Sequence, residues 1–276
     1  MKNIKEYTEE RKAELKQHIT DRGLKPCLVV IQVGDKFESN SYIKGKKRDC
    51  EEVGIECVVK KYNENISHNG LVDVVTSLNE DENVHGIILQ LPVPKHINVG
   101  AIQDLISPLK DVDGFNIQSI FRPCTPAGII KYLKRIGYKF EYKDALVIGR
   151  SDIVGKPLHD MLTDLNCTVT LAHSKTLNLV HKIKDADIVF TCIDKIEYFS
   201  NYWDFDNYTD IVDIGLGLGK DGKLHGNLDH RAVKVLKSRN PERICISGIG
   251  GVGLLTRLAL VENVVSACNM QRKRGE

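Results

Sequence analysis

Two kinds of hydrophobic pattern alternate along the chain. Some segments repeat apolar residues at helical spacing, and the clearest of these lie at 4–22, 39–52, 71–78 and 254–268. Others are short, mostly apolar and rich in β-branched residues, and they predict strands at 27–33, 56–60, 86–91, 145–148, 168–171, 188–192 and 211–214. Helices that alternate with such strands favour βαβ units and a mainly parallel sheet.

The pattern of predicted helices and strands is interrupted once, near the middle of the chain. From Pro92 to about Gly128 the pattern predicts loops and short helices, and a second series of strands and helices begins at Ala145. We therefore expect an α/β fold with two α/β domains, at 1–118 and 119–253. The last helix, over 254–270, is expected to return to the first domain.

The amino-acid composition argues against several classes of protein. The chain has 276 residues, of which 42% are hydrophobic and 28% charged, as in a globular protein. A net charge of +2 gives no reason to expect a nucleic-acid partner. The eight cysteines are scattered without a Cys-x-x-Cys pair, which predicts free thiols in a reducing compartment and no metal site. The start of the chain is charged and no apolar run is long enough to cross a bilayer, so we expect a cytoplasmic protein without a membrane partner.

The strongest local motif is a glycine turn between a strand and a helix, at 147–157. Gly149 and Gly155 frame Arg150 and Ser151, and such a turn lets the backbone approach a pyrophosphate at a helix N-terminus. Ser151 stands where the common dinucleotide fingerprint has its second glycine, so an ordinary strand-to-helix turn remains an alternative.

The end of the next strand bears on the choice of cofactor. The segment 171–176 holds Ser174 and Lys175 but no acidic residue of the kind that binds the ribose hydroxyls of NAD. Together with Arg150, these residues suit a ribose 2′-phosphate, which favours NADP. A polar loop without a ligand is the alternative.

The first half of the chain holds a second group of candidates. Tyr42 and Lys46 are four residues apart on a predicted helix and therefore share a face. Gln90 ends a buried strand, where a parallel sheet forms its binding crevice, and hydrogen bonding to a local backbone group is the alternative role. Asp111 and Asp113 are turn formers or substrate-binding carboxylates. A Tyr-x-x-x-Lys pair also marks short-chain dehydrogenases, but there it follows the nucleotide turn, whereas here it precedes it.

Taken in order, these motifs resemble the methylenetetrahydrofolate dehydrogenase/cyclohydrolase family over nearly the whole chain. The matching segments are 33–46, 86–94, 110–115, 123–126, 148–155, 173–176 and 212–215. The resemblance implies a folate-binding catalytic domain, a Rossmann-like second domain, and a folate cleft between them. It also implies NADP-dependent oxidation of 5,10-methylenetetrahydrofolate, hydrolysis of the methenyl product to 10-formyltetrahydrofolate, a role in purine biosynthesis, and a homodimer.

The resemblance also assigns residues. Lys46 becomes the central catalytic residue, with Tyr42 and Gln90 beside it and Asp113 holding the pterin. The cofactor contacts implied by the matching segments are Gly149, Arg150, Ser151, Val154, Gly155, Ser174, Ile214, Gly251 and Gly253. Oxidation removes a hydride from a carbon between two nitrogens and needs mainly orientation, whereas the hydrolysis needs a group that manages a proton, which suits a lysine.

The chain departs from the family before its last helix. Family members usually carry three prolines in this loop, whereas Ser247, Ile249 and Leu254 stand at those positions within 246–256. The glycines remain, so we expect the cofactor side to survive and the folate side to change. A monofunctional dehydrogenase, a shikimate- or amino-acid-type dehydrogenase and a non-catalytic dinucleotide-binding regulator are the open alternatives.

Overall fold

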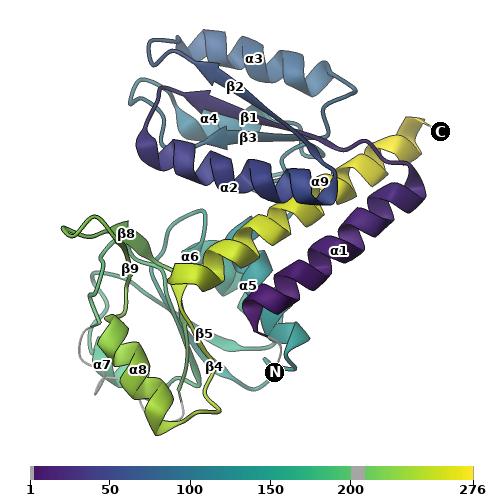
Figure 1. Cartoon of the computed structure of the whole chain (residues 1–276). Helices are drawn as coiled ribbons and strands as arrows, with labels where there is room; N and C mark the ends of the chain where they lie inside the picture. The colour runs from purple at the N-terminus through teal and green to yellow at the C-terminus, as the bar shows by residue number, and fades with distance from the viewer. Residues whose placement is uncertain (1–2, 200–208, 276) are drawn as a thin grey trace. The chain divides into compact units, whose positions relative to one another are not determined.

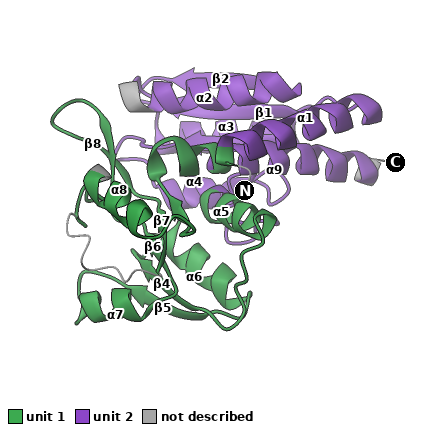
Figure 2. Ribbon diagram, turned by 60° about the horizontal axis from the view of Figure 1, so that its bottom comes forward, with its two compact units in different colours: residues 1–4, 125–255 green, residues 5–124, 256–276 purple. Residues whose placement is uncertain are grey.

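Two parallel sheets form in separate parts of the chain (Figure 1). The computed structural model describes residues 3–199 and 209–275. It divides into unit 1, made of Met1–Ile4 and Thr125–Leu255, and unit 2, made of Lys5–Cys124 and Thr256–Glu276 (Figure 2). The boundary between the units therefore falls inside three helices: near the start of α1 (Ile4–Arg22), of α5 (Cys124–Arg135) and of α9 (Gly253–Gly275).

Unit 2 contains a three-stranded parallel sheet in the order β2-β1-β3. Its strands are β1 (Cys27–Val33), β2 (Glu56–Tyr62) and β3 (Gly86–Gln90). Its helices are α1 (Ile4–Arg22), α2 (Phe37–Val53), α3 (His68–Glu80), α4 (Val99–Leu105) and most of α9. The chain thus places a helix after each strand, which is the connection that parallel strands require.

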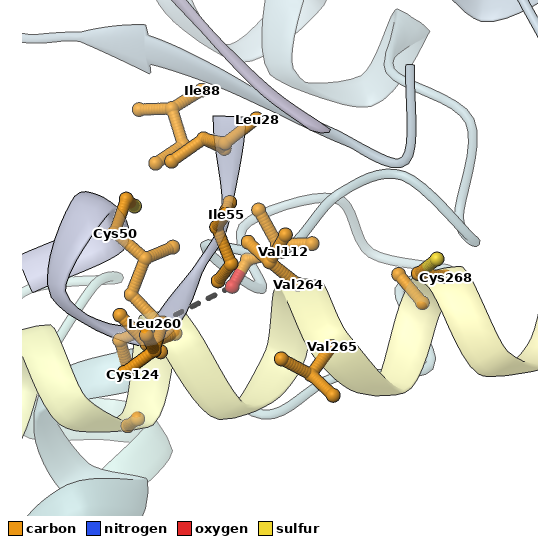
Figure 3. Packing of buried hydrophobic residues seen from close by; sticks show 14 of the residues in the cluster. Leu28, Cys50, Ile55, Ile88, Val112, Cys124, Leu260, Val264, Val265 and Cys268 are labelled. Atoms are coloured by element: carbon orange, nitrogen blue, oxygen red, sulfur yellow. Dashed lines mark hydrogen bonds between the residues drawn. The ribbon is translucent and has the colours of Figure 1, made fainter. Parts of the chain in front are cut away.

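The sheet of unit 2 is buried on both faces. Alternate residues of β1 enter different clusters: Leu28 and Val30 pack with residues of α2 and α9, whereas Val29 and Ile31 pack with residues of α3 and α4. Figure 3 shows the first cluster, in which Leu28 and Ile88 lie on the strands and Val264 lies on α9. Burial on both faces explains why β1 and β3 are mostly continuous apolar runs, whereas the edge strand β2 carries charged residues.

Unit 1 contains a five-stranded parallel sheet in the order β10-β7-β6-β4-β5. The strands are β4 (Asp144–Ile148), β5 (Thr168–Ala172), β6 (Ile188–Thr191), β7 (Asp210–Asp213) and β10 (Cys245–Ile246). An antiparallel hairpin of β8 (Leu216–Leu218) and β9 (Leu224–Gly226) follows β7. The helices are α5 and, after it, α6 (Gly155–Thr163), α7 (Leu179–Asp185) and α8 (His230–Arg239).

The predicted α/β class is confirmed, and all seven predicted strands form with ends shifted by no more than two residues. The region 92–128, for which loops and short helices were predicted, holds α4 and the start of α5, whose continuation to Arg135 was not predicted. Pro126 lies in the first turn of this helix, where a residue without an N–H breaks no helical hydrogen bond. The β8–β9 hairpin was also missed, because its strands have three residues each and carry no strong periodicity.

Helix α9 combines an apolar composition with the greatest length among the described helices. The stretch Gly248–Lys273 is long and apolar enough to cross a membrane by length and composition alone, and 67% of its apolar window is buried inside the structure. A buried core helix meets the same two criteria. Leu258, Val261 and Val265 contribute to the core.

Candidate active site

A pocket of about 450 Å³ lies at the carboxyl ends of the strands of unit 1. It is lined by residues that follow β4, β5, β6 and β7. Strands β5 and β6 lie on opposite sides of β4, so the strand order reverses there. Such a reversal is where open parallel sheets bind ligands.

Six of the nine predicted cofactor residues line this pocket: Gly149, Arg150, Ser151, Val154, Ser174 and Ile214. Gly155 is the first residue of α6 and is bonded to the turn, because its N–H donates to Ser151 Oγ at 3.3 Å. Gly251 and Gly253 lie outside the lining, in the turn before α9 and at its first residue. The structure thus brings together predicted residues that follow β4, β5 and β7.

The glycine turn after β4 has a close backbone approach. Gly149 has φ +126°, and a Cβ there would clash with the carbonyl oxygen of Cys192. A Cβ at Gly155 would in turn clash with the carbonyl oxygen of Gly149. Both positions require glycine, and the first N–H groups of α6 follow this turn, as an anionic ligand prefers.

The polar side chains around the pocket are open to solvent. Arg150, Ser174 and Lys175 are exposed, so their charges and donors are available to a ligand. In the turn after β5, the backbone N–H of Lys175 donates to His173 Nδ1 at 3.1 Å, and this bond stabilises the turn. No acidic residue lies in this turn.

The sequence interpretation missed several lining residues, namely Ile153, His173, Cys192, Ile193, Asp194, Gly215 and Leu216. Most of them follow β6 or β7 directly, and the signal that could have found them is their position at a strand end. Burial raises the pKa of Cys192 to about 12, so this pocket residue stays a neutral thiol. Its Sγ donates to the carbonyl oxygen of Ile148 at 3.3 Å.

In unit 2, the structure brings Lys46 and Gln90 together. Lys46 Nζ donates to Gln90 Oε1 at 3.1 Å, although the two residues are far apart in the chain. Gln90 is the last residue of β3 and only 8% exposed, and its Nε2 donates to the carbonyl oxygen of Leu91 at 2.8 Å. Both ends of the glutamine amide are therefore occupied, which fixes where the lysine amine lies.

Tyr42 and Asp113 have more open surroundings. Tyr42 lies one turn before Lys46 on α2 and is 50% exposed. Asp113 is half-buried, and its backbone carbonyl accepts from the N–H of Cys124 at 3.3 Å. Asp111 is different, because its buried carboxylate accepts from the N–H of Asn116 at 2.8 Å. Of the two candidate aspartates, only Asp113 has a carboxylate available to a ligand.

The segment that lacks the family prolines forms a capped turn. Ser247 precedes the turn η2 (Gly248–Val252), and its Oγ accepts from the N–H of Ile249 at 3.2 Å. The backbone is non-helical at Ile249 and Gly250, and the Ile249 side chain is 51% exposed.

Comparison with known proteins finds two family domains in the chain. Residues 2–113 match the tetrahydrofolate dehydrogenase/cyclohydrolase catalytic domain, and residues 123–272 match the NAD(P)-binding domain of the same family. The bifunctional protein FolD of Thermodesulfovibrio yellowstonii is 38% identical over 275 residues, which cover 95% of this chain and 94% of that protein.

Solved structures of the same family are also similar to this chain. The bifunctional methylenetetrahydrofolate dehydrogenase/cyclohydrolase FolD of Campylobacter jejuni superposes with a TM-score of 0.89 at 36% identity, covering 96% of each chain. The shikimate dehydrogenase of Aquifex aeolicus reaches a TM-score of 0.51 at 15% identity, covering 90% of this chain and 98% of that one, which is a likeness of fold alone.

Proposed function

Because the chain belongs to the tetrahydrofolate dehydrogenase/cyclohydrolase family, we infer that it catalyses two successive reactions on a folate-bound one-carbon unit. It oxidises 5,10-methylenetetrahydrofolate to the 5,10-methenyl form with a nicotinamide dinucleotide. It then hydrolyses the methenyl form to 10-formyltetrahydrofolate. The observation that carries this conclusion is that both family domains match in order along one chain.

The pocket of unit 1 fits a dinucleotide. Its volume of about 450 Å³, the close approach at Gly149 and the helix N-terminus after it suit a pyrophosphate-containing ligand. When bound, the nicotinamide accepts the hydride. The chain contributes backbone donors, the apolar walls made by Val154 and Ile214, and the orientation of the two reactants.

We propose NADP rather than NAD as the cofactor. Arg150 and Ser174 line the pocket, and Lys175 is exposed next to Ser174. Two cationic side chains and a hydroxyl favour a ribose 2′-phosphate.

In unit 2, Lys46 and Gln90 are proposed to carry the hydrolysis. Water attacks the methenyl carbon, and a proton must move as the ring opens. Lys46 Nζ is the group held for that transfer, since Gln90 Oε1 accepts from it at 3.1 Å. Tyr42, on the same face of α2, and Asp113 are proposed to orient the folate.

The family also suggests the setting of the enzyme. We propose a cytoplasmic homodimer whose 10-formyl product serves purine biosynthesis. The eight free cysteines, five of them buried, fit a reducing compartment. Light scattering of the purified chain measures the oligomeric state, and a monomeric mass would contradict a dimer.

An absorbance assay tests the function. The full chain is mixed with 5,10-methylenetetrahydrofolate and either NADP or NAD, and formation of the reduced nicotinamide is followed. Turnover with NADP, together with hydrolysis of added methenyl substrate above the buffer rate, is the expected result. Turnover without hydrolysis would identify a monofunctional dehydrogenase, and turnover with shikimate instead would overturn the assignment.

A further inference from the structure

A buried polar network lies behind the dinucleotide pocket of unit 1. It consists of Thr191 at the end of β6, Asp213 at the end of β7, and Asn227 directly after β9. Thr191 and Asn227 are fully buried, and Asp213 is 2% exposed. None of the three is a lining residue of the pocket, and each is next to one in the chain or bonded to one.

Asp213 joins the ends of two strands to the segment after the hairpin. Its Oδ1 accepts from Thr191 Oγ1 at 2.8 Å and from the N–H of Asn227 at 3.0 Å, and its Oδ2 accepts from the N–H of Leu228 at 3.2 Å. All three donors are neutral. Burial raises the pKa of Asp213 to about 6 although these hydrogen bonds act against the shift.

Asn227 holds one wall of the pocket through its amide. Its Oδ1 accepts from the N–H of Ile193 at 3.1 Å, and its Nδ2 donates to the carbonyl oxygens of Ile193 at 2.8 Å and Lys195 at 2.7 Å. Ile193 and Asp194 both line the pocket. Three hydrogen bonds to the backbone of one short segment fix that segment more firmly than packing alone.

The network also holds the wall that follows β7. Asp213 is followed directly by Ile214, Gly215 and Leu216, which line the pocket. A Cβ at Gly215 would clash with the Asn227 amide, and a Cβ at Gly226 would clash with the Asp213 carboxylate. The backbone therefore approaches both polar groups closely and leaves them little freedom to rearrange.

We infer that Asp213 and Asn227 are positioning residues for dinucleotide binding, and that they hold the β6 and β7 walls of the pocket at the spacing that the cofactor requires. This inference rests on the proposed function of the pocket. Neither side chain touches the ligand, because both act through the backbone of Ile193 to Lys195 and of Ile214 to Leu216. Disturbing the network should weaken NADP binding more than it lowers the stability of the domain.

The test uses the full chain and titrates it with oxidised NADP alone by calorimetry. Asn227→Asp keeps the side-chain shape but turns a carboxylate oxygen toward the carbonyl oxygens of Ile193 and Lys195. Thr191→Val removes one donor to Asp213 at nearly constant volume. We expect each variant to raise the NADP dissociation constant about tenfold, the effect of one hydrogen-bond disruption. Thr191→Ser keeps the hydroxyl and should restore binding.

A matched control separates positioning from general destabilisation. Asp210 begins the same strand at the end away from the pocket, and its Oδ1 accepts from the N–H of Ile244 at 2.8 Å. Asp210→Ala removes this acceptor and should lower the melting temperature while leaving the NADP dissociation constant unchanged. Thermal melts and the cyclohydrolase rate of every variant report whether the chain is folded.

Two results would overturn the inference. One is NADP affinity in Asn227→Asp and Thr191→Val equal to that of the parent; the other is an equal loss of affinity in Asp210→Ala. A parent chain that binds neither NADP nor NAD would instead overturn the proposed function of the pocket, and the inference with it.

Discussion

Lys46 is held at the end of a strand that lies far from it in the chain. Its amine is bonded to Gln90 Oε1, and the other end of that glutamine amide is bonded to the carbonyl oxygen of Leu91. A flexible lysine side chain loses rotamer freedom in this arrangement, which is useful where a proton must be transferred at one defined place.

Replacing Lys46 should separate the two activities. Lys46→Ala removes the group held for proton transfer, and general acid–base assistance typically contributes about 10²–10⁴-fold. We expect hydrolysis of methenyltetrahydrofolate to fall by that factor, with NADP binding unchanged because the pocket belongs to unit 1. Lys47→Ala, an exposed neighbour, is the control. Hydrolysis by Lys46→Ala within threefold of the parent would exclude the role.

Arg150 is the residue on which cofactor choice is predicted to depend. Loss of one charge-assisted contact to a phosphate typically costs about 1.5–3 kcal/mol. Arg150→Ala should therefore weaken NADP by at least about tenfold and weaken NAD much less. Dissociation constants for both cofactors measure the ratio. An equal loss for both, or a parent that prefers NAD, would show that Arg150 does not bind the 2′-phosphate.

At the scale of elements, Lys110 has a structural role. It is 6% exposed, and its Nζ donates to the carbonyl oxygens of Leu78 at 3.0 Å, Asn79 at 2.8 Å and Asp81 at 2.7 Å. Leu78 and Asn79 lie in the last turn of α3 and Asp81 is its C-cap, where the helix carbonyl groups lack partners within the helix. The lysine of the 110–115 motif therefore caps a helix, which favours a positive charge at that end.

Removing this cap should lower stability without changing the chemistry. Lys110→Met leaves three carbonyl groups without their charged donor, and we expect the free energy of unfolding in urea to fall by about 1.5–3 kcal/mol. Lys134→Met, at an exposed position in the last turn of α5, is the matched control and should change it little. Equal effects of the two substitutions would contradict the capping role.

The turn before α9 is a second element with a testable property. Ile249 has φ −77°, close to the value that proline imposes, and its N–H donates to Ser247 Oγ. Changing Ser247 and Ile249 to proline together removes donor and acceptor at once, so no unpaired group remains. Proline at a compatible position reduces the conformational entropy that the free turn loses when it becomes ordered, and this typically amounts to about 0.4–1 kcal/mol.

We therefore expect Ser247→Pro with Ile249→Pro to lower the Michaelis constant for the folate substrate and to leave that for NADP nearly unchanged. Steady-state kinetics with each substrate varied in turn measures both constants. Ser247→Pro alone, which leaves the Ile249 N–H without its acceptor, is the comparison. An unchanged or higher constant for folate in the double variant would mean that this turn serves another ligand.

At the scale of the whole molecule, unit 2 depends on a buried ionic cluster. Asp49 is 1% exposed and is bonded to Lys12 at 2.7 Å and to Arg257, so it links α1, α2 and α9. Burial opposes ionisation of Asp49, but hydrogen bonds from Lys12 and Arg257 outweigh it and keep the pKa of the carboxyl below its ordinary 3.8.

This shift fixes a direction for acid unfolding. The stabilisation is fully present above the unfolded pKa of 3.8 and is lost as pH falls through the lower folded value. Asp49→Asn should lower stability at neutral pH by about 3 kcal/mol and flatten the fall in stability below pH 4, because breaking a buried pair leaves charges uncompensated. Urea unfolding from neutral to acidic pH measures this. Asp35→Asn, at an exposed carboxylate, should have little effect.

The sequence by itself determined the elements and the turn chemistry. The apolar runs of β1 and β3, the glycine turn at Gly149 and the helix stop at Gly54 depend on side-chain periodicity and local backbone preference. These properties act over a few residues, so they are readable before folding. The family motifs added candidate roles for Lys46 and Arg150, and these motifs are also short stretches of sequence.

The tertiary structure determined which residues come into contact. Strand order, which no local pattern encodes, places the ends of β4, β5, β6 and β7 around one pocket and thereby adds Ile193 and Asp194 to it. Folding also distinguishes Asp111, whose carboxylate accepts from the Asn116 backbone, from the more open Asp113, and it buries Asp213 against Asn227. Such partners are 5 to 14 residues apart here and 44 for Lys46 and Gln90, so only chain folding brings them within hydrogen-bond distance.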